Sequence, residues 1–295
     1  MSESTLPKAR GLGAAALRPA TRSGLPDVLQ RILSSTAVRV ASARGEPLAL
    51  PAPALPSLFD NPFGAALRRD RGRAVIAEVK MGSPRLGSLR DRVDPERQAA
   101  AYARAGAAAL SVVVEPEFFF GSYDLLRRCR EASGLPAIAK DFVLDEVQLR
   151  WARDAGASAV LLIAAALERA RLHELGAAAR ALGLLPLVET HDREDLDKLA
   201  GGAVDWELVG VNNRDLRTFQ VDLGSSIELL PDLPAGALKV AESGLHSASD
   251  LQRLSDAGFD AFLIGETLLL DADPERKLRE LLRFRESDLD RGAAP

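Results

Sequence analysis

The sequence is poor in the residues and patterns that mark several classes of protein. It has a single cysteine, Cys129, which cannot form a disulfide framework within the chain or supply a zinc or iron–sulfur site. No apolar run approaches the roughly 20 residues of a membrane-spanning helix. The first 23 residues lack the continuous apolar stretch of a secretory signal and predict a disordered extension. We therefore expect a soluble, cytoplasmic protein.

Histidine is also scarce, and charge of one sign is not in large excess. His173 falls within a predicted helix, while His191 and His246 begin loops, where helix capping or exposure is the expected role, so we expect no bound metal. The 38 basic and 42 acidic residues give a net charge of -4, which argues against a nucleic-acid surface or an anionic-membrane surface. Any site for an anion must therefore be local.

What the sequence does contain is a repeat of short apolar runs, each followed by a helical stretch. The runs begin at Ala74, Ala109, Ala137, Ala159, Leu184, Glu207, Leu238 and Ala261. Glycines at 106, 156 and 258 suit left-handed helix ends. Eight strand–helix units in roughly 220 residues predict a closed (β/α)8 barrel. A doubly wound open sheet is the alternative, but it usually has a Gly-rich dinucleotide turn after its first strand, which this chain lacks.

The segment before the barrel predicts helices joined by a stiff connector. Apolar residues recur at helical spacing from Leu25 to about Ala43, and a second helical pattern runs from Phe59 to Leu67. Prolines at 47, 51, 53 and 56 prevent regular structure between them. We expect a disordered extension over 1–23, helices packed on the barrel over 24–72, the barrel over 73–285 and a flexible tail over 286–295.

The first predicted strand ends in charged residues. Glu78 and Lys80 lie two positions apart, so they project from the same face of the strand that begins at Ala74. Gly82, Ser83, Pro84 and Gly87 follow as a loop. This pair is either the start of an active site, which barrels carry at the carboxyl ends of their strands, or a salt bridge on a solvated rim.

The other strand ends favour the active site, because their polar residues converge on one mouth in a barrel. They are Glu115, Lys140, Glu189, Asn212, Arg214, Glu242, Ser243, Gly265 and Glu266. Confinement of lysines with several carboxylates separates their pKa values and creates acids and bases. Gly244 and Gly265 follow the seventh and eighth strands, where such barrels commonly bind phosphate, and Ser83 can add a hydroxyl donor.

These residues resemble a known family, the indole-3-glycerol-phosphate synthases of tryptophan biosynthesis. The matching motifs are AEVKMGSPRLG, FFFGSYDLL, KDFVLDEVQL, VLLIAAAL, LVETHD, GVNNRDLRTFQVDL, ESGLHSASDL and FLIGETLL. They occur in family order from Leu25 to about Leu282. The resemblance implies a (β/α)8 carboxy-lyase that converts 1-(2-carboxyphenylamino)-1-deoxy-D-ribulose 5-phosphate to indole-3-glycerol phosphate by ring closure, decarboxylation and dehydration, without a cofactor.

The resemblance also implies roles for individual residues. Lys140 resembles the general acid of ring closure, Glu189 the acid–base partner in dehydration, and Lys80, held by Glu78, the lysine that reaches the substrate carboxylate. Asn212, Arg214 and Glu242 would line the polar mouth. The implied phosphate-binding residues are Ser83, Ser243, Gly244, Gly265 and the backbone of Glu266. The implied apolar wall around the anthranilate ring comprises Pro84, Phe119, Phe142, Leu162 and Leu216.

The chain departs from the family pattern in its first loop. It reads KMGSPRLG where the family commonly reads KxxSPSKG, so Arg85 and Leu86 replace Ser and Lys. These changes leave a paralogue acting on a substituted substrate as one alternative, and a non-catalytic phosphate-binding barrel as another. A phosphoribosylanthranilate isomerase is disfavoured, because that family uses a Cys and Asp pair and Cys129 lies in a predicted helix. The expected partner is a phosphorylated small molecule, and the expected assembly is a monomer, with a homodimer as the alternative.

Overall fold

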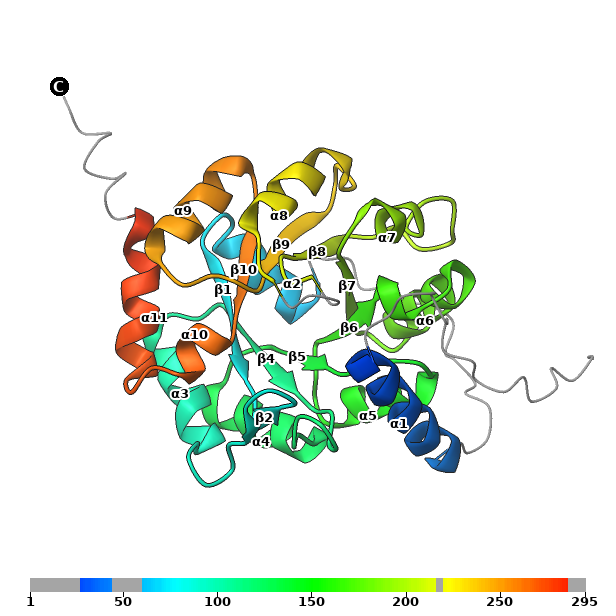
Figure 1. The fold of residues 1–295 in the computed structure, drawn as a ribbon, viewed down its shortest axis with the longest axis horizontal. Helices are drawn as coiled ribbons and strands as arrows, with labels where there is room; N and C mark the ends of the chain where they lie inside the picture. The colour runs from blue at the N-terminus through cyan, green and yellow to red at the C-terminus, as the bar shows by residue number, and fades with distance from the viewer. Residues whose placement is uncertain (1–26, 44–59, 216–219, 286–295) are drawn as a thin grey trace, which may run out of the picture.

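The computed structural model of the chain describes residues 27–43, 60–215 and 220–285. Eight parallel strands close into a barrel in the order β1-β10-β9-β8-β7-β6-β5-β4, with the helices outside them (Figure 1). The strands are β1 Ala74–Val79, β4 Ala109–Val113, β5 Ala137–Lys140, β6 Ala159–Ile163, β7 Leu185–Thr190, β8 Leu208–Asn212, β9 Leu238–Glu242 and β10 Ala261–Ile264. The predicted barrel is confirmed, and every predicted apolar run contains one of these strands.

Helices connect the strands and cover their outer faces. They are α3 Pro95–Ala105, α4 Tyr123–Ser133, α5 Glu146–Asp154, α6 Arg169–Ala181, α7 Arg193–Asp197, α8 Leu223–Leu229, α9 Ala248–Ala257, α10 Glu266–Leu269 and α11 Pro274–Leu282. The glycines at 106, 156 and 258 have φ values of 96°, 84° and 118°, as expected for left-handed helix ends. No helix within these described ranges is long and apolar enough to cross a membrane.

Two further helices precede β1 and lie at opposite ends of the barrel. Helix α2, Pro62–Arg69, begins at Asn61, whose side chain also donates to the carbonyl oxygens of Ser158 and Gly183 at 2.8 and 3.2 Å. Those carbonyls precede β6 and β7, so α2 closes the amino-terminal end. Helix α1, Asp27–Ala43, lies beside α5 and reaches the carboxyl-terminal mouth (Figure 1).

The predicted limits of the helical segment, 24–72, and of the barrel, 73–285, stay a proposal. Helix α2 ends before residue 72 and β1 begins after it. The predicted disordered segment 1–23, the proline connector and the tail 286–295 lie outside the described residues.

The first loop after β1 folds back as a small hairpin. Strands β2 Gly82–Ser83 and β3 Gly87–Ser88 pair in antiparallel fashion, and Met81 is buried beneath them. A β-carbon at Gly82 would collide with the Phe120 ring and the Gly87 carbonyl oxygen. Packing of the hairpin therefore explains the glycine at this position.

Candidate active site

A cavity of about 610 Å³ opens at the carboxyl-terminal mouth of the barrel. Its floor comes from strand ends, including Glu78, Lys140, Glu189 and Asn212, and its roof includes α1. Parallel strands with one residue facing inward at every second position bring these groups together from segments more than a hundred residues apart.

Lys140, the last residue of β5, lies at the centre of a cluster of acids. Its Nζ is 3.1 Å from Glu242 Oε2, 3.8 Å from Glu78 Oε2 and 3.9 Å from Glu189 Oε2. Burial by itself would lower the pKa of Lys140, but the three carboxylates outweigh burial and raise it above its ordinary value. Lys140 is therefore held as an ammonium ion and is able to donate a proton into the cavity.

Glu78 and Lys80 form the second ion pair of the floor, with Lys80 Nζ 3.0 Å from Glu78 Oε1. Burial of Glu78 opposes its ionisation, but Lys80 and Lys140 together lower its pKa. A β-carbon at Gly265 would collide with the Glu78 carboxylate. Gly265, which follows β10, therefore makes room for the Glu78 side chain, in addition to the phosphate contact predicted for it.

Glu242 is the acid in this cluster that resists ionisation. Its carboxyl is buried at the end of β9, and burial raises its pKa to about 7 against the opposing effect of Lys140, with Glu189 raising it further. Gly210 of β8 lies so close to Glu242 Oε1 that a β-carbon there would displace the carboxyl. Near neutral pH the site can therefore hold an exchangeable proton beside Glu189.

One side of the cavity is apolar. The rings of Phe119 and Phe142 lie 5.9 Å apart, and Pro84 also lines the cavity. Val28, Leu29 and Ile32 of α1 complete this wall, a contribution that the sequence analysis did not identify.

Two apolar residues implied by the resemblance are not part of this wall as described. Leu162 is not among the residues that line the cavity, whereas its neighbours Leu161 and Ile163 are, as expected where side chains alternate along a strand. Leu216 lies outside the described residues.

The opposite rim is polar and basic. Ser83, Asn212, Arg214, Ser243, Gly244, Gly265 and Glu266 all line it. Glu266 sits between two arginines, with Arg85 Nη2 at 2.5 Å and Arg214 Nη2 at 3.6 Å. Arg85, one of the departures from the family pattern, therefore links the first loop to the start of α10, which follows the neighbouring strand β10.

Two strand-end residues do not fit the sequence-based interpretation. Glu115 accepts the backbone N–H groups of Glu117, Phe118 and Phe119 at 3.0, 2.7 and 3.0 Å, so it orders the loop after β4 and is not among the residues that line the cavity. His191 was expected to cap a helix or to be exposed. Its side chain is instead only 11% exposed and lies between Glu189 and Asp195.

The other two histidines differ in burial. His246 is exposed as expected, and its Nδ1 is 2.9 Å from Thr267 Oγ1. His173 is buried in α6, and its Nε2 is 3.0 Å from the Lys198 carbonyl oxygen. Across the described ranges, no group of three or more His, Cys, Asp and Glu side chains is arranged to hold a metal ion.

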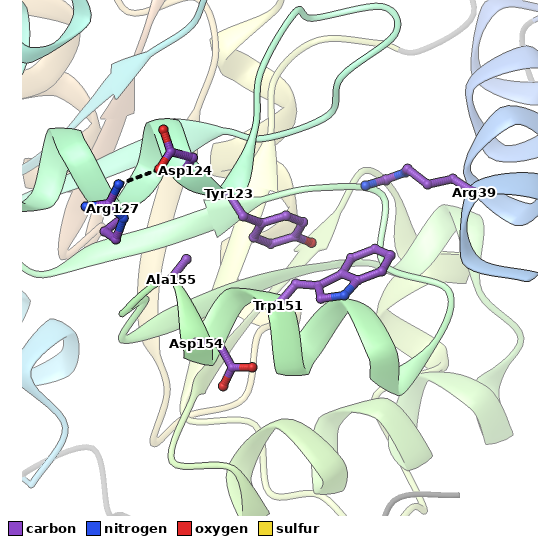
Figure 2. A pocket seen from close by; sticks show the side chains of 7 residues that line it. All are labelled: Arg39, Tyr123, Asp124, Arg127, Trp151, Asp154 and Ala155. Atoms are coloured by element: carbon purple, nitrogen blue, oxygen red, sulfur yellow. Dashed lines mark hydrogen bonds and ion pairs between the residues drawn. The ribbon is translucent and has the colours of Figure 1, made fainter. Parts of the chain in front are cut away.

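A second, more open cavity of about 490 Å³ lies outside the barrel between α1, α4 and α5. Figure 2 shows Arg39 of α1 extending toward the rings of Tyr123 and Trp151. Arg39 Nη2 donates to both carboxylate oxygens of Asp141 at 3.0 Å, and the Tyr123 hydroxyl donates to Asp141 Oδ2 at 2.8 Å. Because Asp141 follows Lys140 in the chain, these bonds tie α1 to the strand end that carries the central lysine.

The closed parallel barrel and its clustered acids and bases define a (β/α)8-barrel enzyme. Two solved structures share this fold. Thiamine phosphate pyrophosphorylase from Pyrococcus furiosus has a TM-score of 0.55 at 12% identity, with 75% of this chain and 99% of that chain covered. 3-Hexulose-6-phosphate synthase from Salmonella typhimurium has a TM-score of 0.56 at 14% identity, with 72% of this chain and 99% of that chain covered. At these identities the likeness shows the fold alone.

Sequence comparison identifies the family. The family profile of indole-3-glycerol phosphate synthase matches residues 29–281. The synthase of Laribacter hongkongensis is 43% identical over 263 residues, covering 87% of this chain and 99% of the relative. The synthase of Bordetella pertussis is 42% identical over 261 residues, covering 87% of this chain and 99% of the relative. The chain belongs to the indole-3-glycerol phosphate synthase family, and it is a carboxy-lyase of tryptophan biosynthesis.

Proposed function

We propose that the cavity at the barrel mouth converts 1-(2-carboxyphenylamino)-1-deoxy-D-ribulose 5-phosphate to indole-3-glycerol phosphate. The observation that carries this proposal is the position of Lys140, an ammonium among three buried carboxylates, between an aromatic wall and a basic rim. The aromatic wall suits the anthranilate ring, and the basic rim suits the phosphate. The substrate would then lie with its carbonyl group near Lys140.

Lys140 acts as the general acid of ring closure. The ring carbon that bears the carboxylate attacks the ribulose carbonyl carbon, and the carbonyl oxygen gains negative charge as the new bond forms. A positioned ammonium can protonate that oxygen and stabilises it before protonation. Loss of CO2 then returns the bonding electrons to the ring. The raised pKa of Lys140 supports this role, because it keeps the proton on the lysine until the oxygen develops charge.

Dehydration needs an acid and a base on adjacent atoms. Lys80, which reaches the substrate carboxylate before it leaves as CO2, donates the proton to the departing hydroxyl, and Glu189 removes the proton from the neighbouring carbon. The ring nitrogen assists departure of the hydroxyl, which leaves as water with the proton from Lys80. The C–H bond next to the nitrogen then breaks, its electron pair forms the new double bond and its proton goes to Glu189, so the step needs no oxidant or reductant. The separation of roles is supported by the pairing of Lys80 with Glu78 at 3.0 Å, while Glu189 lies 3.9 Å from Lys140.

The phosphate end is assigned to the rim formed by Ser83, Ser243, Gly244, Gly265 and the backbone of Glu266. Ser243 and Gly244 have φ values of 66° and 75°, so the chain turns sharply after β9 and brings backbone close to the mouth. Asn212 and Arg214 of the same rim, with Glu242 buried 3.1 Å from Lys140 Nζ, are the remaining polar groups assigned to the substrate.

The test is to incubate the purified chain with the carboxyphenylamino ribulose phosphate and to follow indole fluorescence. Wild type should form product, and Lys140→Ala should not do so at a comparable rate. Lys277→Ala on the outer helix α11 is the matched control and should behave as wild type. Product formation only from a ring-substituted substrate would favour the specialised paralogue. No product from any such substrate, with tight binding of the phosphate compound, would favour a non-catalytic barrel.

We also propose that the enzyme acts in the cytoplasm as a monomer. The supporting observation is Cys129, the single cysteine of the chain, whose thiol is buried and free, as is usual for a reducing compartment. Light scattering of the purified chain at several concentrations should give the monomer mass of 31.5 kDa, and twice that mass would show a homodimer.

A further inference from the structure

His191 is a buried titratable residue that the mechanism above does not use. It follows β7 directly, two positions after Glu189. Its Nε2 lies 3.3 Å from Glu189 Oε1, and its Nδ1 lies 3.4 Å from Asp195 Oδ2. The imidazole therefore sits in a row between two carboxylates, one in the cavity floor and one behind it.

The surroundings hold the ring in this place. Asp195 is wholly buried at the end of the row, and it accepts the backbone N–H of His191 at 3.1 Å as well as facing its ring. Thr190, between Glu189 and His191, donates its hydroxyl to the Gly210 carbonyl oxygen at 2.9 Å and so fixes the end of β7. Both ring nitrogens are buried, and neither meets the geometry of a hydrogen bond with a described group, so the contacts with Glu189 and Asp195 are ion-pair contacts. The two carboxylates are therefore the groups that each nitrogen faces.

The charges around His191 come from three elements. Glu189 of β7, Asp195 of α7 and Glu242 of β9 are the acids that act on it, and each favours the imidazolium form. The nearest cations lie beyond those acids. Lys140 Nζ is 3.9 Å from Glu189, and Lys198 Nζ is 3.6 Å from Asp195. Burial alone would lower the pKa of His191, but the surrounding carboxylates raise it above its ordinary value.

We propose that His191 is a positioning residue that holds a proton against Glu189, so that Glu189 enters the reaction as an ionised base, with Asp195 fixing the orientation of the ring. This rests on the proposed role of Glu189 in dehydration. The geometry gives each partner one task. Nδ1 faces Asp195 Oδ2 and Nε2 faces Glu189 Oε1, which leaves Oε2 of Glu189 on the side of Lys140.

A direct test measures the wild-type protein and uses one substitution only to assign a resonance. The chain has three histidines, so NMR titration of ¹⁵N-histidine-labelled protein gives few resonances, and His191→Gln assigns one of them. The His191 ring should keep both protons well above the pH at which an ordinary histidine loses one, near 6.5. A neutral His191 ring at pH 6 would overturn the proposal.

The kinetic test compares pH profiles. In His191→Gln an amide can still donate to Glu189 but carries no charge, so loss of the positive charge beside the base should be worth about one pH unit or more in the rate profile. The acidic limb of kcat should move to higher pH by that amount, which is about a tenfold loss of rate at a fixed pH on that limb, with KM little changed. Asp195→Asn should give a smaller shift in the same direction. An unshifted limb in a folded His191→Gln would refute the proposal, as would a loss confined to KM.

A double-mutant cycle separates this inference from the proposed function. If His191 acts through Glu189, His191→Gln should cause no further loss in the residual single-turnover rate of Glu189→Gln. Full additivity of the two losses would refute the inference while leaving the role of Glu189 intact. Wild-type activity in Glu189→Gln alone would instead remove Glu189 from the mechanism, and with it the proposal for His191.

Discussion

Replacement of Glu242 by glutamine should make the protein more stable at alkaline pH, although Glu242 lies at the centre of the active site. Burial raises the pKa of this carboxyl from 4.5 to about 7, so the folded chain binds a proton here that the unfolded chain releases at lower pH. The stability that this group contributes is fully present below pH 4.5 and is lost as the pH rises toward 7. Glutamine has the shape of the protonated acid and no charge, so the variant does not undergo this loss.

The magnitude follows from the shift. A difference of about 2.5 pKa units at about 1.36 kcal/mol each gives roughly 3 kcal/mol as the pH-dependent part of the effect. The free energy of unfolding of Glu242→Gln minus that of wild type should therefore increase by roughly 3 kcal/mol between pH 4.5 and pH 8. The increase should occur mainly below pH 7, where the wild-type carboxyl titrates.

Urea unfolding of both proteins at several pH values between 4.5 and 8 measures this difference, with equal m-values as the check that the same surface unfolds. Glu228→Gln, on the exposed side of α8, is the control and should give a difference that does not change with pH. A flat difference for Glu242→Gln, or one that falls as the pH rises, would refute the reasoning. Activity should fall at the same time, which would show that the buried acid is kept for catalysis and not for stability.

Other substitutions test separate parts of the site. Lys140→Ala should fold and lose at least about 100-fold in kcat, as expected of a general acid, and a near-wild-type kcat would remove it from the mechanism. Arg39→Ala should lower the free energy of unfolding in urea by about 2 kcal/mol, because it leaves the wholly buried Asp141 without its cation while neighbouring hydrogen bonds remain. Arg39→Lys should recover part of this loss. An unchanged free energy of unfolding in Arg39→Ala would show that the pair contributes nothing to stability. Arg85→Ser with Leu86→Lys should change steady-state kcat more than the single-turnover rate, because it breaks the ion pair between Arg85 and Glu266 and leaves the floor intact. Equal changes in both rates would show that the loop acts on the chemical step.

The sequence by itself determined the barrel and most of the floor of the site. Its strands are short apolar runs buried on both faces, and such runs are legible without tertiary information because nearly every position in them must be apolar. A charged residue at the end of such a run, such as Glu78 or Lys140, interrupts the apolar pattern, and the strand ends of a closed barrel meet at one mouth. The positions of these two residues therefore followed from the pattern, whereas Glu115, at the end of another run, orders a loop instead.

Only the tertiary structure decided which groups meet through their side chains. Arg39 and Asp141 are 102 positions apart, and neither the helical pattern around one nor the strand end beside the other indicates that they pair. The choice of Leu161 and Ile163 over Leu162 as cavity residues depends on how the strand is rotated in the barrel, since all three are apolar and all three are buried. The burial of His191 also could not be read from the sequence, because a loop histidine is ordinarily exposed. Its burial against Glu189 and Asp195 arises from the short turn between β7 and α7, which folds the chain back onto its own strand end.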